Sequence, residues 1–582
     1  MVDDLFVEYN TKLMKKIFTG LSLLAIVIAS SWALAHEQFF RAHDYIHAAR
    51  IIEMYRSLSE GQFPVRWSEN FGYGYGMPLF EFYAPLPYYV GAILHWLGLG
   101  VLTAVKLLFL FSAIFITWGS YKLGKELFGE AAGILTAAAI TLAPYRAVNL
   151  FVRGALSEAW GIMAIPWVLL GMLQVIKQEK NGWQTLTISL VVLMLSHNIM
   201  TMLFVPLGLL FAVLYAGFSK WVVHKNKTNQ LKTLLRINGS LLLATGLSSF
   251  YLFPALLEKN LTKVGSIFAG YFHYSHHFLY IRQFFQLNWG YEGSAWGPDD
   301  GISFFLGWGQ LIGLGILALL LLIRMFKHKK WQQIASDKKI VLSVLLGALS
   351  GLSLFMAILK SKPLWDALPG LSFAQFPWRF LGVGIIFIGL LVGSSASLIK
   401  QRGLRYLWSL VLLIILLFNA KFFQPKEFLV DANQFYYTDA DLIQREMSGI
   451  LPDYIPVQMS DKLVPPTSLV WCEDDCSAQI EVLINRSHEN LIRTNFTKEK
   501  VVEWAVADFP GWKVELDGEK YQKEQGEIGN IVVAVPAGEH LVGVLFTQTP
   551  VRLLFDVISL VSLFIFIYLI TKTKEKPNFT KL

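Results

Sequence analysis

Long apolar runs occupy most of the chain between residues 17 and 421, and one further run lies near its end. An apolar helix of about 20 residues crosses a hydrocarbon core of about 30 Å. The runs that approach this length predict an α-helical polytopic membrane protein with about twelve transmembrane helices. These helices are expected at residues 17–35, 102–120, 131–144, 158–176, 184–197, 199–218, 237–256, 303–324, 340–359, 380–399, 404–421 and 551–571.

One apolar segment, residues 79–97, is broken by prolines and contains several Tyr and Trp side chains. Proline interrupts helices, and aromatic side chains favour the headgroup region, so we interpret this segment as a juxtamembrane helix. If it crossed the membrane instead, the basic clusters at 220–236, 324–339 and 400–405 would all lie outside. The positive-inside rule therefore predicts that these clusters and both termini are cytoplasmic.

Between residues 422 and 550 the pattern changes to short runs in which apolar and polar residues alternate. A period of two is typical of β-strands that have one buried face. We predict a small external β-sandwich, preceded by a short helix near residues 439–447. The expected domains are a transmembrane domain at 1–421, the external domain at 422–550, and a final helix with a cytoplasmic tail at 551–582.

Composition agrees with a chain that has lipid as its main solvent, because 54% of the residues are hydrophobic, 16% are charged and the mean hydropathy is +0.48. The net charge of +8 lies largely in short loops, which fits membrane topology better than nucleic-acid binding. Cys472 and Cys476 are too few for a disulfide scaffold or a zinc ribbon. They form either one small disulfide loop or two free thiols.

Polar residues that hydropathy does not explain gather in the predicted external loops. The first of these loops contains His43, Asp44 and Arg66. A carboxylate just beyond the first membrane helix can act as a base on a substrate held at the bilayer surface. The alternative is that Asp44 caps a helix expected at residues 45–58.

A second group of polar residues follows in two later external loops. Arg153 and Glu158 flank the start of one predicted span, and His197 lies between two others. Arg146 is explained by snorkelling to the interface. Glu158, at the start of an apolar helix, either pairs with Arg153 or takes part in catalysis.

The remaining candidates lie in two aromatic loops. Residues 289–300 combine Trp289 and Asp299 with glycines, which suits stacking on sugar rings but is also ordinary turn chemistry. Arg379 stands among aromatic residues at the end of a span, where a guanidinium can bind a lipid phosphate with two hydrogen bonds. His273, His276 and His277 have no carboxylate or cysteine beside them, so we predict no metal site there.

Several motifs together resemble those of the bacterial YfhO-like membrane proteins and of the membrane proteins labelled "6-pyruvoyl-tetrahydropterin synthase-related". Both groups are placed with the GT-C glycosyltransferases, and the resemblance covers nearly the whole chain. It rests on the His43-Asp44 pair and on the segments 74–89, 145–158, 196–198, 376–380, 509–518 and 535–540.

The resemblance implies a polyprenyl-phosphate-linked sugar donor and an acidic base in the first external loop, which maps to Asp44. The pterin-related label implies a soluble zinc enzyme, which the hydropathy of this chain excludes. No DxD or DxE pair stands in the first loop, so no cofactor is predicted and a divalent metal is left open.

The sequence thus predicts a multi-pass cell-membrane glycosyltransferase of the inverting GT-C type, which passes a sugar to an extracytoplasmic glycan, lipid or polymer. Membrane lipid is an expected partner and nucleic acid is not. The alternatives are a transporter or flippase of lipid-linked glycans and a non-enzymatic envelope assembly protein. The expected catalytic residues are Asp44, Glu158 and His197, and the expected substrate-binding residues are His43, Arg66, Arg153, Trp289, Asp299 and Arg379.

Overall fold

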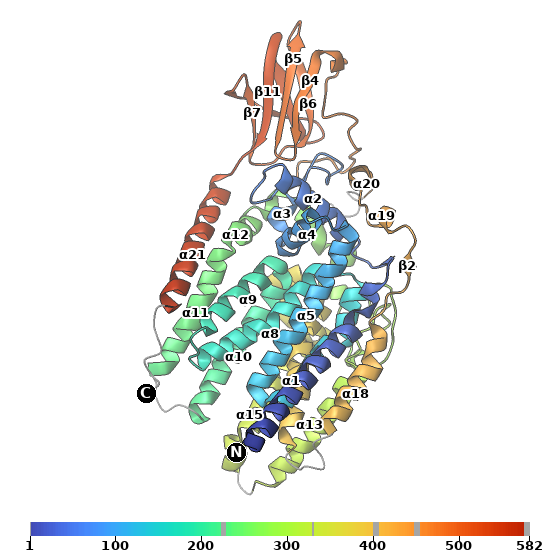
Figure 1. The fold of residues 1–582 in the computed structure, drawn as a ribbon. Helices are drawn as coiled ribbons and strands as arrows, with labels where there is room; N and C mark the ends of the chain where they lie inside the picture. Colours follow the sequence, from blue (N-terminus) through green and yellow to red (C-terminus); the bar gives the residue numbers. More distant parts are fainter. Residues whose placement is uncertain (1, 223–227, 329–330, 400–406, 447–453, 575–582) are drawn as a thin grey trace. The chain divides into compact units, whose positions relative to one another are not determined.

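The computed structural model describes residues 2–222, 228–328, 331–399, 407–446 and 454–574 (Figure 1). The chain forms two compact units whose segments alternate along the sequence. The first unit consists of Met1–Asp44, Lys106–Ala244 and Gly270–Val430. The second consists of Tyr45–Val105, Thr245–Ala269 and Asp431–Leu582. The predicted division into three consecutive domains stays a prediction beside these interleaved units.

Helices make up nearly all of the first unit. Its helices are α1 (Val2–Ser31), α5 (Val101–Phe128), α6 (Glu130–Thr141), α7 (Pro144–Ala147), α8 (Leu156–Ile176), α9 (Gly182–Ser196), α10 (Asn198–Val222), α11 (Thr228–Leu247), α13 (Trp308–Phe326), α14 (Trp331–Ser336), α15 (Lys338–Ala357), α16 (Lys362–Ala367), α17 (Phe380–Leu398) and α18 (Leu407–Asn419). The ends of α5 and α11, Val101–Val105 and Thr245–Leu247, belong to the second unit.

The core of the first unit forms around α8 and α17, whose side chains are largely buried. Helix α17 packs against α6, α13 and α15, and α8 packs against α9. Gly389 and Gly393 are four residues apart on the face of α17 that meets α6, where a Cβ would collide with Ile140 or Thr136. Small residues at this spacing let two helix backbones approach closely without a gap.

The polytopic character predicted from hydropathy is confirmed. Within the described residues, eight helices are long and apolar enough to cross a membrane, and two further spans are bent pairs of helices, at residues 130–152 and 231–257. The predicted spans at 184–197 and 404–421 correspond to shorter apolar helices, Gly182–Ser196 and Leu407–Phe422. Twelve spans were predicted, and the described residues contain eight to ten by length and composition.

The first bent pair turns by 47° between Thr141 and Pro144. Proline has no backbone N–H, so a break here frees carbonyl groups of the preceding turn. Two side-chain amides donate hydrogen bonds to carbonyls near this break. Asn419 Nδ2 lies 3.0 Å from the Leu142 carbonyl, and Gln310 Nε2 lies 2.8 Å from the Ala139 carbonyl. The amide of Asn419 also donates to Gln310 Oε1 at 2.7 Å. Neighbouring helices thus satisfy the broken backbone, as an apolar environment requires.

The second unit contains both helices and strands. Its helices are α2 (His47–Ser59), α3 (Leu79–Phe82), α4 (Leu86–Trp96), α12 (Ser249–Leu257), α19 (Ala432–Phe435), α20 (Ala440–Arg445) and α21 (Pro550–Lys574). Helix α4 has 11 residues, about 16 Å at 1.5 Å per residue, which is shorter than a hydrocarbon core. This length agrees with reading residues 79–97 as a segment that does not span the membrane.

The predicted C-terminal β region is confirmed. One sheet has the order β3-β6-β10-β9 and the other β4-β5-β11-β7-β8, with antiparallel neighbours. The strands are β3 (Val470–Trp471), β4 (Ile480–Arg486), β5 (Glu489–Phe496), β6 (Lys500–Ala507), β7 (Trp512–Leu516), β8 (Glu519–Tyr521), β9 (Glu524–Gln525), β10 (Asn530–Val535) and β11 (Gly538–Phe546). Buried Trp504, Val533, Ile492 and Val544 come from both sheets. Cys472 and Cys476 form a disulfide.

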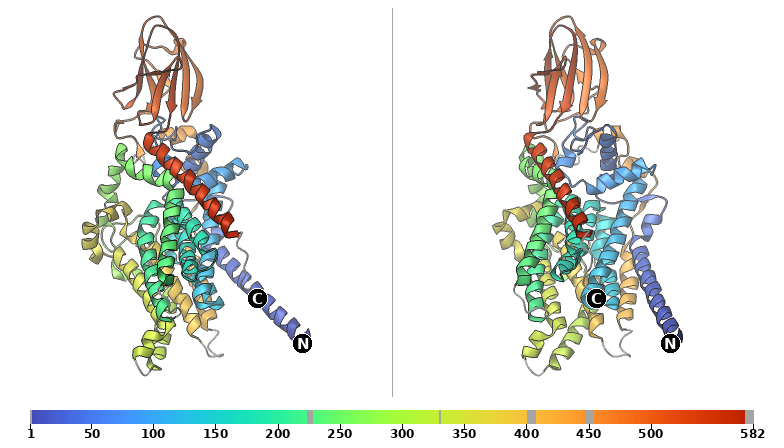
Figure 2. Two further views of the ribbon diagram at one scale, coloured as in Figure 1. Left: turned by 90° about the vertical axis from the view of Figure 1, so that its left-hand side faces the viewer. Right: turned by 60° about the vertical axis from the view of Figure 1, so that its left-hand side comes forward.

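Helix α20 lies where a short helix was expected, and the end of that expected helix, residue 447, lies outside the described residues. Helix α21 follows the last strand directly and packs beside α12 (Figure 2). Helices α20 and α21 flank the β region in the sequence and join it to the helical part of the second unit.

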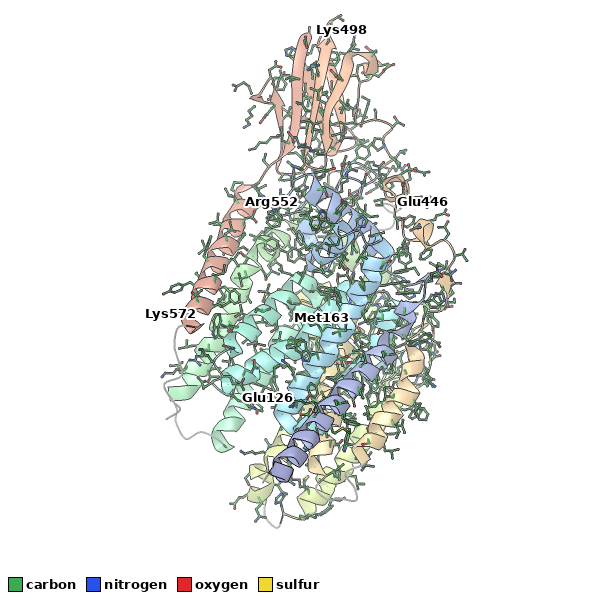
Figure 3. The ribbon with its side chains drawn as sticks, viewed as in Figure 1. Glu126, Met163, Glu446, Lys498, Arg552 and Lys572 are labelled. Carbon is green, nitrogen blue, oxygen red and sulfur yellow. A yellow bond between two sulfur atoms is a disulfide. The ribbon has the colours of Figure 1, made fainter. Side chains whose placement is uncertain are left out.

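Arg552, near the start of α21, is the centre of a buried ion cluster in this unit (Figure 3). Its Nε lies 2.9 Å from Glu81 Oε2, and its Nη2 lies 2.9 Å from Glu258 Oε2. Its Nη1 donates to the Pro510 carbonyl at 2.9 Å. Because Arg552 is 0% exposed, its charge depends on these protein partners for stabilisation.

Replacing Arg552 by Met should lower the free energy of unfolding by about 3–5 kcal/mol, because Glu81 and Glu258 would stay buried without a cation. Denaturant titration of the purified protein in detergent measures this change. Arg445→Met is the matched control, since the ion pair of Arg445 with Asp441 is exposed and its loss should leave the titration unchanged. Equal midpoints for the two variants would contradict the stabilising role of Arg552.

Candidate catalytic site

Asp44 is held in place by its backbone. Within the first unit, the short strand β1 (Phe39–Phe40) pairs with β2 (Phe428–Leu429), and the chain then runs along residues 152–154. The His43 amide donates to the Val152 carbonyl at 3.0 Å, and the Asp44 amide donates to the Arg153 carbonyl at 2.7 Å. Gly154 allows this approach, because it has a φ of +66° and a Cβ there would lie 2.7 Å from that of Ala42.

The carboxylate of Asp44 is half-buried and makes no hydrogen bond within the described part of the chain. Helix α2 begins at His47 with Ile46 as its N-cap, and no side chain caps it. The interpretation of Asp44 as a helix cap is therefore wrong. Its charge instead acts on the guanidinium groups of Arg153 and Arg379.

Glu158, in the first turn of α8, lies at the centre of the charged cluster beside Asp44 and is 1% exposed. Tyr145 donates its hydroxyl to Oε1 at 2.7 Å, and Asn149 Nδ2 donates to the same oxygen at 3.2 Å. Arg153 Nη1 lies 2.8 Å and Arg379 Nε 3.3 Å from Oε2. Both carboxylate oxygens thus have partners. The pairing of Glu158 with Arg153 was one of the two alternatives that the sequence left open.

The two arginines also have fixed surroundings. The guanidinium of Arg153 stacks on Trp378 at 4.7 Å, and that of Arg379 stacks on Phe376 at 4.9 Å. Arg379 Nη1 donates to the Ala374 carbonyl at 2.8 Å. Burial lowers the pKa of Arg153, but Glu158, Tyr145 and Asp44 together raise it more, and the net shift is upward. Two arginines around one glutamate leave a net positive charge, and the Asp44 carboxylate acts on both arginines.

His197 joins this cluster from the junction of α9 and α10. It is 9% exposed, and its Nδ1 accepts a hydrogen bond from the Met200 amide at 2.9 Å. Its Cβ packs against Gly161, one turn along α8 from Glu158. The charges of Glu158, Arg379 and Arg153 all act on its ring. Four segments that are far apart in the sequence therefore meet here.

Sequence reasoning missed Tyr145 and Asn149 as partners of Glu158. A signal was present, because Tyr145, Asn149 and Arg153 follow one another at intervals of four residues and so share one face of a helix. The explanation of Arg146 by snorkelling is wrong. Arg146 is 0% exposed, and none of its guanidinium nitrogens makes a hydrogen bond among the described residues.

Three other candidates have partners away from Glu158. Arg66 belongs to the second unit, where it donates to Asp556 at 2.5 Å and to the Phe250 carbonyl at 2.9 Å. Trp289 stacks on Phe422 with ring centroids 4.6 Å apart. Asp299 is exposed and pairs with Arg282 at 3.0 Å.

His43 connects the aromatic loop to the segment that carries Asp44, because its Nε2 lies 2.9 Å from the Tyr291 carbonyl. Asp300, and not Asp299, holds that loop together. It accepts hydrogen bonds from the Ala295 amide at 2.7 Å and from Gln283 Nε2 at 2.6 Å. Burial raises the pKa of Asp300 to about 6. The residues that the structure describes include no group of three His, Cys, Asp or Glu side chains placed to hold a metal ion.

No protein-family model matches the chain, so the resemblance to YfhO-like proteins stays a prediction. An uncharacterized protein from Lactococcus lactis subsp. cremoris (strain MG1363) is 26% identical over 245 residues, which is 40% of this chain. The chain spans 38% of that curated relative's length.

Three solved membrane proteins are similar in structure at low sequence identity. The arabinofuranosyltransferase AftD from mycobacteria has a TM-score of 0.40 and 14% identity, over 74% of this chain and 27% of its own. ArnT from Cupriavidus metallidurans, bound to undecaprenyl phosphate, has a TM-score of 0.36 and 14% identity, over 67% and 62%. The apo oligosaccharyltransferase from Archaeoglobus fulgidus has a TM-score of 0.40 and 11% identity, over 73% and 60%.

Glu158→Gln should lower the free energy of unfolding by about 3–5 kcal/mol, because it leaves Arg153 and Arg379 buried without a counter-charge. Asp44→Asn should change it by less than about 0.5 kcal/mol, since no hydrogen bond of that carboxylate within the described chain is lost. Denaturant titration of both variants tests this contrast. A strongly destabilised Asp44→Asn protein would show that Asp44 supports the fold.

Proposed function

We propose that this protein is a membrane glycosyltransferase that takes a sugar from a polyprenyl-phosphate donor and passes it to an acceptor hydroxyl. The observation that carries the proposal is the carboxylate of Asp44, which has no hydrogen-bond partner in the described chain and whose charge acts on Arg153 and Arg379. Glu158 holds both arginines. A free base beside fixed cations is the combination that this transfer needs.

In the proposed reaction, Asp44 accepts the proton of the acceptor hydroxyl. At the same time, the oxygen of that hydroxyl bonds to the anomeric carbon of the sugar. The bond between that carbon and the phosphate oxygen breaks, and the electron pair leaves with the phosphate. Attack from the face opposite the leaving group inverts the anomeric configuration. Arg153 and Arg379 stabilise the departing phosphate, because guanidinium groups offer paired donors to phosphate oxygens.

The other residues of the cluster have positioning roles in this proposal. Glu158 fixes the two arginines, Tyr145 and Asn149 fix Glu158, and His197 packs beside α8. His43 contacts the adjoining aromatic loop that contains Trp289, whose rings can stack on the sugar or on the acceptor. The sidedness expected from the basic loops places this cluster on the extracytoplasmic face.

A transporter or flippase of lipid-linked glycans is the second candidate, and the broken helices favour it. Transporters commonly build their binding sites from discontinuous membrane helices. Two apolar spans are bent here, by 47° and 74°. A transporter would move the lipid-linked sugar across the bilayer without cleaving it, so the two candidates differ in whether the donor is consumed.

Asp44→Asn should reduce sugar transfer by about 100-fold or more, because it removes the base and keeps the size of the side chain. The assay follows loss of radiolabelled sugar from undecaprenyl-phosphate hexoses and pentoses in vesicles that contain the full-length protein and a cell-envelope acceptor fraction. Asp366→Asn, which changes an exposed carboxylate of the same unit, should keep full activity. Transfer that survives Asp44→Asn within a few-fold would exclude Asp44 as the base, and movement without transfer would support the transporter.

Membrane-impermeant maleimide should label Lys520→Cys on intact cells and should label Lys338→Cys only after the cells are opened. Both side chains are exposed, and the basic loop around Lys338 is expected in the cytoplasm. The two native cysteines form a disulfide and do not react, so each variant carries one reactive thiol. The reverse labelling pattern would place the β region inside the cell and exclude the proposed sidedness.

A further inference from the structure

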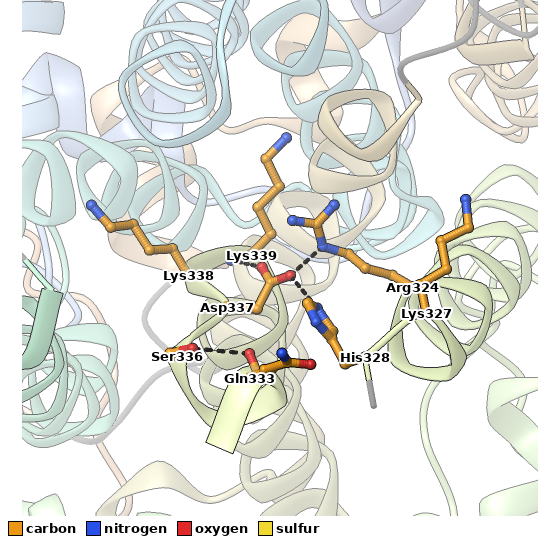
Figure 4. A pocket seen from close by; sticks show the side chains of 8 residues that line it. All are labelled: Arg324, Lys327, His328, Gln333, Ser336, Asp337, Lys338 and Lys339. Atoms are coloured by element: carbon orange, nitrogen blue, oxygen red, sulfur yellow. Dashed lines mark hydrogen bonds and ion pairs between the residues drawn. The ribbon is translucent and has the colours of Figure 1, made fainter. Parts of the chain in front are cut away.

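A basic cleft lies in the first unit between the end of α13 and the start of α15. It is an open depression with a volume of about 700 Å³, lined by Arg324, Lys327, His328, Gln333, Ser336, Asp337, Lys338 and Lys339 (Figure 4). Helices α13 and α15 are both long and apolar enough to cross a membrane. The cleft therefore lies at the ends of two spans, where lipid headgroups are found.

Positive charge dominates the lining of this cleft. Arg324 and three lysines stand against Asp337 alone, which gives a net charge of +3 while His328 is neutral. Basic pockets between transmembrane helices are typical binding sites for phosphate-bearing headgroups. Phe326, which is 86% exposed beside the cleft, adds an apolar surface at the same depth.

Asp337 organises the cleft and is itself occupied. Its Oδ2 accepts from Arg324 Nε at 2.5 Å and from His328 Nε2 at 3.0 Å, and its Oδ1 accepts from the Lys339 amide at 3.1 Å. The last contact caps α15. Asp337 thus fixes the ring and the guanidinium at the edge of the cleft and adds the positive end of a 20-residue helix to it.

Lys327 and Lys338 are the lining cations available to a ligand. Lys327 and Lys338 are exposed and form no ion pair in the described part of the chain, whereas Lys339 donates its ammonium to the Ser397 carbonyl. Figure 4 shows Lys327 and Lys338 extending from opposite helices that bound the cleft. Their ammonium groups lie on opposite sides of the view with the Arg324 guanidinium between them, so cations line the whole width of the cleft.

We propose that this cleft binds the phosphate of an anionic ligand, either a phospholipid headgroup or a free phosphate group. The site is distinct from the Glu158 cluster, and it does not depend on the glycosyltransferase assignment. Each lysine near an anionic surface is worth about 1 kcal/mol, which is about fivefold in affinity. Removing Lys327 and Lys338 together should therefore weaken binding by about 25-fold.

The test is native mass spectrometry of the full-length protein in detergent with phosphatidylglycerol, with phosphatidylcholine and with inorganic phosphate. Lys327→Gln/Lys338→Gln should bind phosphatidylglycerol about 25-fold more weakly than the wild type, and phosphatidylcholine should bind weakly to both. Lys360→Gln/Lys426→Gln removes the same charge from exposed lysines of the same unit outside the cleft. This control should bind phosphatidylglycerol as the wild type does.

Displacement of phosphatidylglycerol by millimolar inorganic phosphate would identify the free anion as a ligand, and retention would identify the lipid headgroup. Lys327→Arg/Lys338→Arg should keep binding, which separates loss of charge from misfolding. Equal phosphatidylglycerol affinity in the wild type and in Lys327→Gln/Lys338→Gln would overturn the proposal. Equal binding of phosphatidylcholine and phosphatidylglycerol by the wild type would overturn it too.

Discussion

The buried carboxylate of Glu158 is the constraint on which the candidate site depends. An ionised carboxylate inside a helical membrane domain is costly unless cations and hydrogen-bond donors surround it. Arg153, Arg379, Tyr145 and Asn149 supply them from three parts of the chain. Because the partners cannot move away without exposing a buried charge, they fix the start of α8 against the start of α17 and against the segment before α8.

The geometry of Asp44 follows from this arrangement. The loop 152–154 is held by Arg153, and the backbone of His43 and Asp44 pairs with that loop. Glycine at position 154 permits the close approach, because no Cβ occupies the space beside Ala42. The backbone therefore places the Asp44 carboxylate near two arginines, while Glu158 already occupies part of their hydrogen-bonding capacity. A carboxylate held in this way is available to a substrate.

Burial also decides whether charges in two other parts of the molecule need protein partners. In the second unit Arg552 is buried and has Glu81 and Glu258 as partners, which connects α21 to α3 and α12. At the ends of α13 and α15 the charges are exposed, so water can solvate Lys327 and Lys338 without protein counter-ions. Buried charges thus hold elements together, and exposed charges of the same type stay available for ligands.

The sequence by itself determined the polytopic helical character, the β region after residue 421 and the candidates Asp44, Arg153, Glu158, His197 and Arg379. Apolar runs of membrane length and alternating strands carry these features locally, because each depends on the nature of neighbouring residues along the chain. The pairing of Glu158 with Arg153 was also open to prediction, since both lie within six residues of sequence.

Only the tertiary structure decided how Arg379 reaches Glu158, that Asp44 caps no helix, and that Arg146 is buried instead of snorkelling. It also placed Arg66 in an ion pair with Asp556, and both residues belong to the second unit. These outcomes depend on which helices pack together, and contacts between residues hundreds of positions apart leave no periodic signal in the sequence. Local patterns fix what each segment is, and long-range packing fixes which charges meet.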